Sequence, residues 1–340
     1  MKQKLKDICT LEKGKQIDTK MLDDSNKYRY INGGINESGF YNEYNTEGET
    51  VLISEGGASC GYVNYVDEKF WCGCHCYRLT NISVFPKYLF YSLKASQNGL
   101  MELRTGAAMP NIKKEFLKEF EISISESKEV QKKVVYELDS IQSAIDNKKQ
   151  QLFLLDEAVK SEFVEMFGNP ITNSKKFPTK KVIDVVTLQR GYDLPVQDRD
   201  STGSIPVFGS NGILGTHNVA KINKGVVTGR SGTIGEVYLC DEPFWPLNTT
   251  LFSNDTHGNN LCYLKYLLEF FDLKRFKSGV GVPTLNRNEF HDEQIIDVSL
   301  ELQNKFATFV QQIDKSKFVV KQQISDLQEL LDSKMQEYFS

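Results

Sequence analysis

The sequence lacks the short motifs with which proteins bind nucleotides. It contains no Gly-x-x-x-x-Gly-Lys-Ser/Thr loop, and the pair Gly14-Lys15 is followed by Gln16, so we expect no nucleoside triphosphate site in the chain. No Gly-x-Gly-x-x-Gly opens a helix after a predicted strand, which argues against a dinucleotide cofactor. The stretch Phe167–Pro170 ends a helical pattern. We interpret Gly168 as the left-handed residue that closes this helix, and not as part of a catalytic loop.

Metal-binding and catalytic patterns are also missing. The seven cysteines are an odd number without a repeated spacing, which favours free thiols in a reducing compartment. Cys72, Cys74 and Cys76 would point to one face of an extended strand and His75 to the other, which does not suit a tetrahedral metal site. We therefore predict buried thiols, no metal, no cofactor and no catalytic residue in this chain. A thiol-ligated zinc protein is the alternative, and metal analysis of the purified protein distinguishes the two.

Long apolar runs are absent too. No stretch of about 18 apolar residues occurs, and residues 1–7 have no apolar segment typical of a secretory signal, so we expect a cytoplasmic protein without a membrane span. The net charge of −4 argues against a protein that coats nucleic acid without sequence preference, because such binding depends on an excess of Lys and Arg. A sequence-specific reader with local basic patches is still compatible with this charge.

What the chain does contain is a tandem repeat. The strip Gly61–Trp71 returns as Gly235–Trp245 with Gly, Val, Asp-Glu and Phe-Trp in register, and Leu5–Gly14 matches Val182–Gly191. A third pair, Gly106–Pro110 and Gly279–Pro283, follows in the same order. The spacing between the two copies of each strip is far too long for the repeat of a solenoid, so the sequence predicts two copies of one module.

Each copy shows the pattern of an α+β domain followed by a long helix. Short β-rich segments with Gly and Asn punctuation surround one helix in each copy. The predicted strands are 28–31, 51–54, 61–66 and 74–79 in the first copy, and 225–228, 235–239 and 249–252 in the second. The predicted helices are 86–100 and 261–271. The domains are expected at 1–126 and 169–298, the second with a linker at 169–178.

The segments 127–168 and 299–340 are predicted to be helices of roughly 60 Å that pair as a long antiparallel two-helix coiled coil. Apolar residues recur there at spacings of three and four, interrupted by Lys148 and Lys317. The alternative is that each helix packs on its own domain as a surface helix, but its length argues against this. The residues expected to pair the helices are Leu138, Ile141, Ile145, Leu152, Leu155, Val159, Val310, Ile313, Val320, Ile324, Leu327 and Leu331.

Candidate DNA-binding residues lie in the basic cluster after the core of each copy. In the second copy they also lie in the Gly, Ser and Thr-rich segment and at the end of the matched strip Val182–Gly191. Small residues allow close approach of the backbone, and hydroxyls and guanidinium groups bond phosphates. Arg230 is able to reach guanine O6 and N7 or clamp a phosphate, whereas the first copy offers Gly56 at this place. Tight turns and a solvated surface are the alternatives. The candidates are Arg104, Lys113, Lys114, Arg190, Tyr192, Arg230, Ser231, Thr233, Arg275, Lys277 and Arg287.

This organisation resembles the specificity subunits of type I restriction-modification systems, on the strips Leu5–Gly14, Val182–Gly191, Leu154–Pro170 and Phe306–Lys317. The resemblance implies that each of two target recognition domains reads one half of a bipartite, asymmetric site in double-stranded DNA. It implies that the helices serve as a ruler and dock two methyltransferase subunits, through which restriction and translocase subunits join. S-adenosylmethionine, ATP and Mg are then expected on those partner subunits, with no catalytic residue here.

A non-catalytic protein scaffold with duplicated end domains is the main rival. We expect DNA retention, measured with the methyltransferase partner present, to fall steeply as salt rises and to depend on sequence, because phosphate contacts release counterions and base contacts discriminate. Retention that is absent, or that ignores sequence at every salt concentration, would favour the scaffold.

Overall fold

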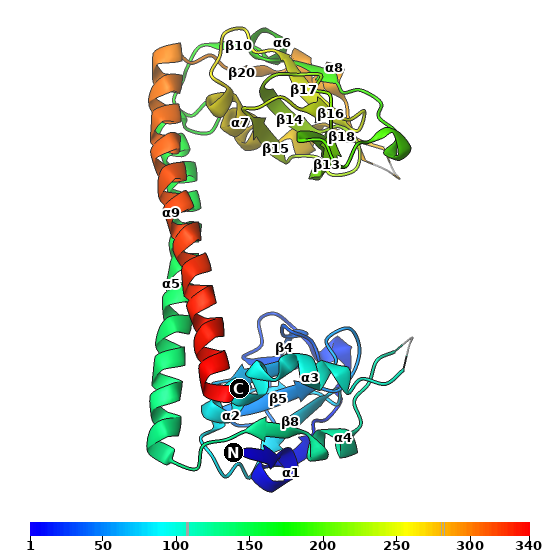
Figure 1. Cartoon of the computed structure of the whole chain (residues 1–340). Coiled ribbons are helices and arrows are strands. Elements are labelled where there is room, and N and C mark those ends of the chain that lie inside the picture. Colours follow the sequence, from blue (N-terminus) through cyan, green and yellow to red (C-terminus); the bar gives the residue numbers. More distant parts are fainter. Residues whose placement is uncertain (107–108, 280, 282) are drawn as a thin grey trace. The chain divides into compact units, whose positions relative to one another are not determined.

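The computed structural model describes the whole chain except residues 107–108, 280 and 282, and it divides into two compact α+β units (Figure 1). The first unit comprises Met1–Lys149 and Gln322–Ser340, and the second comprises Gln150–Lys321. Parts of the repeated strips 106–110 and 279–283 lie outside the described residues. The predicted α+β class with tandem duplication is confirmed, because the two units repeat one order of strands.

In the first unit, a four-stranded antiparallel sheet has the order β2-β8-β5-β6, and a three-stranded sheet has the order β4-β3-β7. The strands β1 and β9 form a separate antiparallel pair. The strands are β1 Lys2–Lys4, β2 Thr10–Lys13, β3 Tyr28–Ile31, β4 Phe40–Tyr41, β5 Thr50–Ser54, β6 Val63–Val66, β7 Trp71–Cys72, β8 Cys76–Thr80 and β9 Glu121–Ser123. The helices are α1 Leu5–Ile8, η1 Thr19–Met21, α2 Pro86–Ala95, α3 Gln97–Glu102, α4 Lys114–Glu119 and parts of α5 (Lys128–Phe167) and α9 (Leu300–Phe339).

The second unit repeats this plan. Its sheets have the orders β11-β17-β14-β15 and β13-β12-β16, with β10 paired to β20 and an added pair, β18 with β19. The strands are β10 Thr179–Lys181, β11 Thr187–Arg190, β12 Ile205–Gly209, β13 Gly212–His217, β14 Gly225–Gly229, β15 Val237–Cys240, β16 Trp245–Pro246, β17 Thr250–Asp255, β18 Lys277–Ser278, β19 Thr284–Leu285 and β20 Gln294–Ile296. The helices are α6 Val182–Val185, η2 Val196–Asp198, α7 Leu261–Phe270, η3 Leu273–Phe276, α8 Arg287–Asp292 and the remaining parts of α5 and α9.

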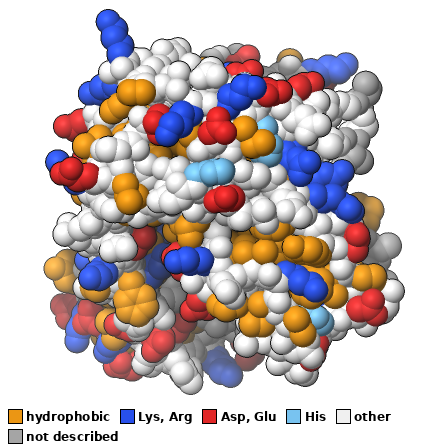
Figure 2. All heavy atoms as spheres, turned by 90° about the horizontal axis from the view of Figure 1, so that it is seen from above, with side chains coloured by type: hydrophobic (Ala, Val, Ile, Leu, Met, Phe, Trp, Pro, Cys, Tyr) orange, Lys and Arg blue, Asp and Glu red, His pale blue; other side chains and the backbone are white. Residues whose placement is uncertain are grey.

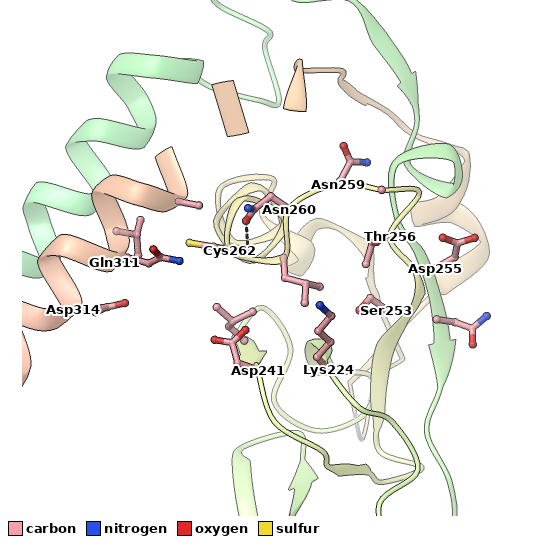
Figure 3. Close-up of a pocket in the computed structure, with 16 residues that line it drawn as sticks. Lys224, Asp241, Ser253, Asp255, Thr256, Asn259, Asn260, Cys262, Gln311 and Asp314 are labelled. Carbon is pink, nitrogen blue, oxygen red and sulfur yellow. Dashed lines mark hydrogen bonds between the residues drawn. The ribbon is translucent and has the colours of Figure 1, made fainter. Parts of the chain in front are cut away.

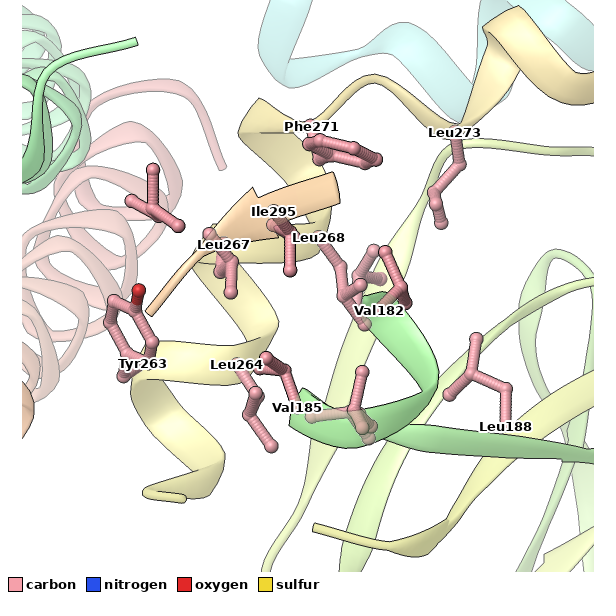
Figure 4. Close-up of a cluster of buried hydrophobic side chains, with 14 of the residues drawn as sticks. Val182, Val185, Leu188, Tyr263, Leu264, Leu267, Leu268, Phe271, Leu273 and Ile295 are labelled. Carbon is pink, nitrogen blue, oxygen red and sulfur yellow. The ribbon is translucent and has the colours of Figure 1, made fainter. Parts of the chain in front are cut away.

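The core of the second unit forms where α7 covers β14 and β15. Leu264, Leu267 and Leu268 recur along one face of α7, which is the spacing that buries an amphipathic helix, and all three are fully buried. They meet Val182 and Val185 of α6 and Ile295 of β20 (Figure 4). Asn260 caps the start of helix α7, because its side chain accepts hydrogen bonds from the backbone N–H groups of Cys262 and Tyr263.

Two predictions about the first unit were wrong in detail. The strand expected at 74–79 begins only at Cys76, because residues 73–75 turn the chain from β7 into β8, with His75 N–H donating to Asn32 Oδ1 at 3.1 Å. Cys72 and Cys76 are buried in different sheets and Cys74 is partly exposed. The helix predicted over 86–100 is broken at Ser96 into α2 and α3, because Ser96 leaves the helical conformation (φ −93°, ψ 15°).

The long helices α5 (Lys128–Phe167) and α9 (Leu300–Phe339) begin and end within one residue of the predicted bounds. Gly168, directly after α5, has the predicted left-handed backbone, with φ 70°. Both helices contribute residues to both units. Among the described residues, no helix is both long and apolar enough to cross a membrane.

Within each unit the two helices contact each other and also cover the domain core. In the first unit the early part of α5 packs against the late part of α9, and in the second the late part of α5 packs against the early part of α9. The pairing is therefore antiparallel in each. Of the residues expected to pair the helices, Leu138, Ile145, Val159, Val310, Val320 and Leu331 are buried, and Ile141, Leu152, Leu155, Ile313, Ile324 and Leu327 are half-buried.

Lys317 interrupts the apolar seam as the sequence suggested. Its side chain is only 16% exposed, and its ammonium lies 2.5 Å from Asp156 of α5. Asp314 of α9 itself also lies 3.6 Å from this ammonium, so Asp156 is the partner that a shifted helix register would remove. The ion pair thus favours one register of the pair within the second unit.

His291 of α8 is buried in the second unit, where its Nε2 accepts a hydrogen bond from the backbone N–H of Leu188 at 3.0 Å. Burial, followed by the nearby charge of Arg287, lowers the pKa of His291. As pH falls, the unfolded chain, with a histidine pKa of about 6.5, therefore binds the proton before the folded chain does. The stabilisation is fully present above about pH 6.5 and is lost as pH falls through the folded-state pKa.

We expect the free energy of unfolding to decrease between about pH 7 and pH 5, and His291→Leu to remove that part of the decrease. The variant leaves a buried N–H without an acceptor, which costs about 1–3 kcal/mol at pH 8. Denaturant titrations across pH measure both effects. The matched control is His257→Asn, at an exposed turn position with φ 48° that Asn tolerates. An unchanged pH dependence in His291→Leu would contradict this assignment.

Candidate nucleic-acid interface

Each unit has the same loop arrangement after one inner strand of its four-stranded sheet, β5 in the first unit and β14 in the second. In the second unit, Gly232 N–H donates to the Pro283 carbonyl at 3.0 Å and Leu285 N–H donates to the Arg230 carbonyl at 2.8 Å. In the first unit, Gly57 N–H donates to Pro110 at 2.9 Å, and Ile112 N–H to Glu55 at 2.9 Å. The glycine-rich segments 55–61 and 230–235 are thereby fixed against the chain that follows the domain helix.

The turns in these segments depend on glycine. Gly57 and Gly232 have φ angles of 77° and 91°, a left-handed backbone that side-chain-bearing residues rarely adopt. The tight-turn interpretation is therefore correct for the backbone.

The structure corrects the match of Arg230 to Gly56. The hydrogen bonds to the carbonyls of Arg230 and Glu55 are equivalent, and each residue directly follows the last residue of its strand, Gly229 or Ser54. The counterpart of Arg230 is therefore Glu55. The sequence alignment placed it one residue too far along because the glycine-rich segment is one residue longer in the first copy.

Three of the predicted residues, Arg190, Arg230 and Arg287, come together in the second unit. They line one pocket of about 340 Å³ together with Ser278, Thr284, Asn286 and Asn288. Arg190 ends β11, Arg230 follows β14, and Arg287 begins α8. Three arginines that line one pocket favour an anion or an acceptor edge of a base.

A chain of polar contacts holds two of these arginines. Arg230 Nη1 donates to the Asn248 carbonyl at 3.0 Å, and Asn248 Nδ2 donates to Asp193 Oδ1. Arg190 Nη2 lies 3.3 Å from the same Asp193 oxygen. Asp193 and Asn248 were missed by sequence reasoning, because neither is basic and neither lies in a repeated strip.

The equivalent place in the first unit is electrically different. Lys13, which matches Arg190 at the end of the first strip, lies 2.6 Å from the carboxylate of Glu55. Tyr77 OH also donates to Glu55, at 2.9 Å, and burial, reinforced by this bond, raises the pKa of Tyr77. The Glu55 side chain is 8% exposed and that of Lys13 is 52% exposed. Lys13 was missed, although its match to Arg190 in the repeat signalled it.

The other predicted residues have varied surroundings. Arg104 and Lys113 are exposed on either side of the paired residues Thr105 and Asn111, and Lys114 is half-buried at the start of α4. In the second unit, Lys277 and Thr233 are exposed and Ser231 is half-buried, bridged to Thr284.

Arg275 and Tyr192 have packing partners that account for their positions. The Arg275 guanidinium lies over the rings of Phe271 and Phe276, at 4.7 and 5.0 Å. The ring of Tyr192 is half-buried and stacks on Phe252 at 5.8 Å. Both contacts are of a kind that stabilises a fold.

A larger pocket, of about 600 Å³, is a different site (Figure 3). It is lined by Asp241, Asp255 and Asp314 with Lys224, so its charge does not favour phosphate. Strand register places it at the opposite end of β17 from the arginine pocket, since Asp255 pairs with Thr187 whereas Leu251 pairs with Arg190.

Charge on the face shown in Figure 2 is mixed, not segregated. On the face shown in Figure 2, Lys and Arg side chains lie among Asp and Glu side chains, in keeping with the net charge of −4. Binding to nucleic acid would therefore depend on local sites such as the arginine pocket, and not on a general basic field.

Comparisons with known proteins agree with this architecture. Residues 1–155 and 174–329 match the model of the type I restriction modification DNA specificity domain. A putative type I specificity subunit of Mycoplasma genitalium is 28% identical over 99% of this chain and 93% of its own length. A second, from Mycoplasma pneumoniae, is 28% identical over 65% of this chain and 62% of its own length.

Two solved structures share the fold. The crystal structure of a type I restriction-modification system S subunit from M. genitalium superposes with a TM-score of 0.66 at 21% identity, covering 100% of this chain and 96% of that one. A chain from a study of complex assembly and conformational transition of the type I restriction-modification system superposes with a TM-score of 0.55 at 11% identity, covering 99% of this chain and 97% of that one.

Proposed function

Because this chain belongs to the type I restriction-modification DNA specificity family, we propose that it is the subunit that selects a bipartite, asymmetric DNA target for a methyltransferase and restriction complex. Its two domains would each read one half of the target. The proposal rests on the duplication of one loop framework, fixed by equivalent hydrogen bonds, that carries different side chains in the two copies.

The different side chains at equivalent positions favour recognition of a DNA sequence over binding to the DNA backbone alone. A duplicated attachment site would keep the same charges in both copies, since both copies would meet the same sugar-phosphate backbone. Here an arginine pocket in the second unit stands where the first unit has a neutral Lys13–Glu55 pair. Two domains that differ in this way suit two different half-sequences, and hence an asymmetric target.

The chemistry of such a complex would belong to partner subunits. We assign no catalytic residue to this chain, in keeping with the DNA specificity family to which it belongs. Two methyltransferase subunits would bind S-adenosylmethionine, and restriction subunits joined through them would bind ATP and Mg. One of the structures that share this fold comes from work on the assembly of a type I complex, which supports partners of this kind.

The long helices would set the distance between the half-sites. Two domains that enter major grooves on one face of the duplex would read half-sites about 34 Å apart, one turn of the double helix. One heptad is worth about 10 Å of helix, or about three base pairs. The unread gap in the target should therefore change in steps when whole heptads are removed or added.

We predict that deleting residues 146–152 and 318–324 together shortens the unread gap by about three base pairs and leaves both half-sequences unchanged. These deletions remove one heptad from each helix and preserve the phase of the apolar seam on either side. Single-molecule sequencing of methylated DNA, with the variant coexpressed with its methyltransferase subunits, reads the gap directly.

The matched control inserts one heptad at the same two points, and it should lengthen the gap by the same amount. An altered half-sequence in either variant, or a gap that stays the same in both, would exclude the helices as a spacer.

A further inference from the structure

The arginine pocket of the second unit has the geometry of a base reader. Arg230 is held by its backbone and by its side chain. Its backbone N–H donates to the Thr249 carbonyl at 2.8 Å, and its own carbonyl accepts from the Leu285 N–H at 2.8 Å. Its Nη1 donates to the Asn248 carbonyl at 3.0 Å. A guanidinium held in this way keeps Nε and Nη2 as further donors. Discrimination between bases requires such a fixed pair of donors, whereas a phosphate is bound by a flexible side chain equally well.

Two other basic residues of the second unit, Arg190 and Lys277, are more exposed than Arg230, which suits them to a different role. Arg190 is exposed at the end of β11 and has an ion partner in Asp193. Lys277 is exposed on β18. Lys277 directly precedes Ser278, which lines the pocket. Arg190 and Lys277 both suit contact with phosphates, because exposed cations lose little hydration before they meet the DNA backbone.

We propose that Arg230 is the residue through which the second domain requires a guanine, read at its O6 and N7 acceptor edge in the major groove. The proposal rests on the function proposed above and specifies one base of the second half-site. Arginine bonded to both guanine acceptors is the commonest specific contact to a base in DNA. A backbone phosphate also offers a pair of hydrogen-bond acceptors, so the experiment has to distinguish a guanine from a phosphate.

The first domain does not read guanine in this way. At the equivalent position the Glu55 carboxylate is an acceptor, and it is occupied by Lys13 Nζ at 2.6 Å and Tyr77 OH at 2.9 Å. A carboxylate has no proton to donate to O6 or N7 at neutral pH. Glu55 acts as a positioning residue that holds Lys13, so this contact to guanine belongs to the second domain alone.

The test compares Arg230→Gln, Arg230→Lys and Lys277→Gln, each in the full chain assembled with its methyltransferase subunits. Sequencing of methylated DNA gives the motif, and DNA binding measured across salt gives the salt dependence. Arg230→Gln should relax one guanine of the second half-site, with a loss of discrimination of roughly tenfold to a hundredfold at that base pair. Arg230→Lys should relax the same position while binding keeps its salt dependence, because the charge remains but the paired donors are lost.

Lys277→Gln is the matched control, since it removes one positive charge from the same domain. It should weaken binding to all sequences, reduce the salt slope by about one, and leave the motif unchanged. The first half-site, read by the same molecule, reports in every variant whether the chain is folded and assembled.

Three outcomes would decide the matter. Relaxation of one guanine in the second half-site by both Arg230 variants supports the proposal. An unchanged motif with uniformly weaker binding in Arg230→Gln overturns it in favour of a phosphate contact, while the proposed function stands. If the unaltered chain directs methylation to no two-part motif at all, the proposed function itself fails.

Discussion

One buried glutamine at the start of each long helix fixes that helix to the domain it follows. Gln131 and Gln303 are 2% and 1% exposed. Gln131 donates to the Ser125 carbonyl at 2.6 Å and accepts from Phe85 N–H at 3.1 Å, and Gln303 makes the same pair of bonds with Val298 and Asn260, at 2.8 and 2.9 Å. A buried amide is stable only if it is fully hydrogen-bonded. Within each unit, this sets the direction in which the helix leaves the domain, on which any spacing function depends.

The same framework then carries different chemistry in its two copies. Backbone hydrogen bonds keep the glycine-rich segments equivalent, so side chains after the central strand are free to vary without altering the fold. Glu55 with Lys13 gives a neutral surface in one copy, and Arg230 with Arg190 and Arg287 gives a cationic pocket in the other. A scaffold that separates backbone structure from side-chain choice in this way is suited to changing specificity by single substitutions, because stability and recognition depend on different atoms.

Periodicity and repetition made the architecture predictable from the sequence, whereas the candidate site was not. The strips Leu5–Gly14 and Val182–Gly191 revealed the duplication, and spacings of three and four gave both long helices. The pocket was not foreseeable as a unit, since Arg190, Arg230 and Arg287 lie far apart in the chain and meet only through the sheet and α8. Because the glycine-rich segment is one residue longer in the first copy, the sequence alignment paired Arg230 with Gly56 instead of Glu55. The strand expected through Cys74 failed because a turn there is fixed by Asn32, a contact that no local pattern signals.

The central claim is that two similar domains each select one half of a divided DNA sequence. The most direct measurement is a methylation map of genomic DNA from cells that carry the chain with its methyltransferase partner and from matched cells without the chain. We expect one asymmetric motif, made of two specified parts and an unread gap, to disappear when the chain is removed. The loss of an undivided motif, or a map that does not change at all, would contradict the account.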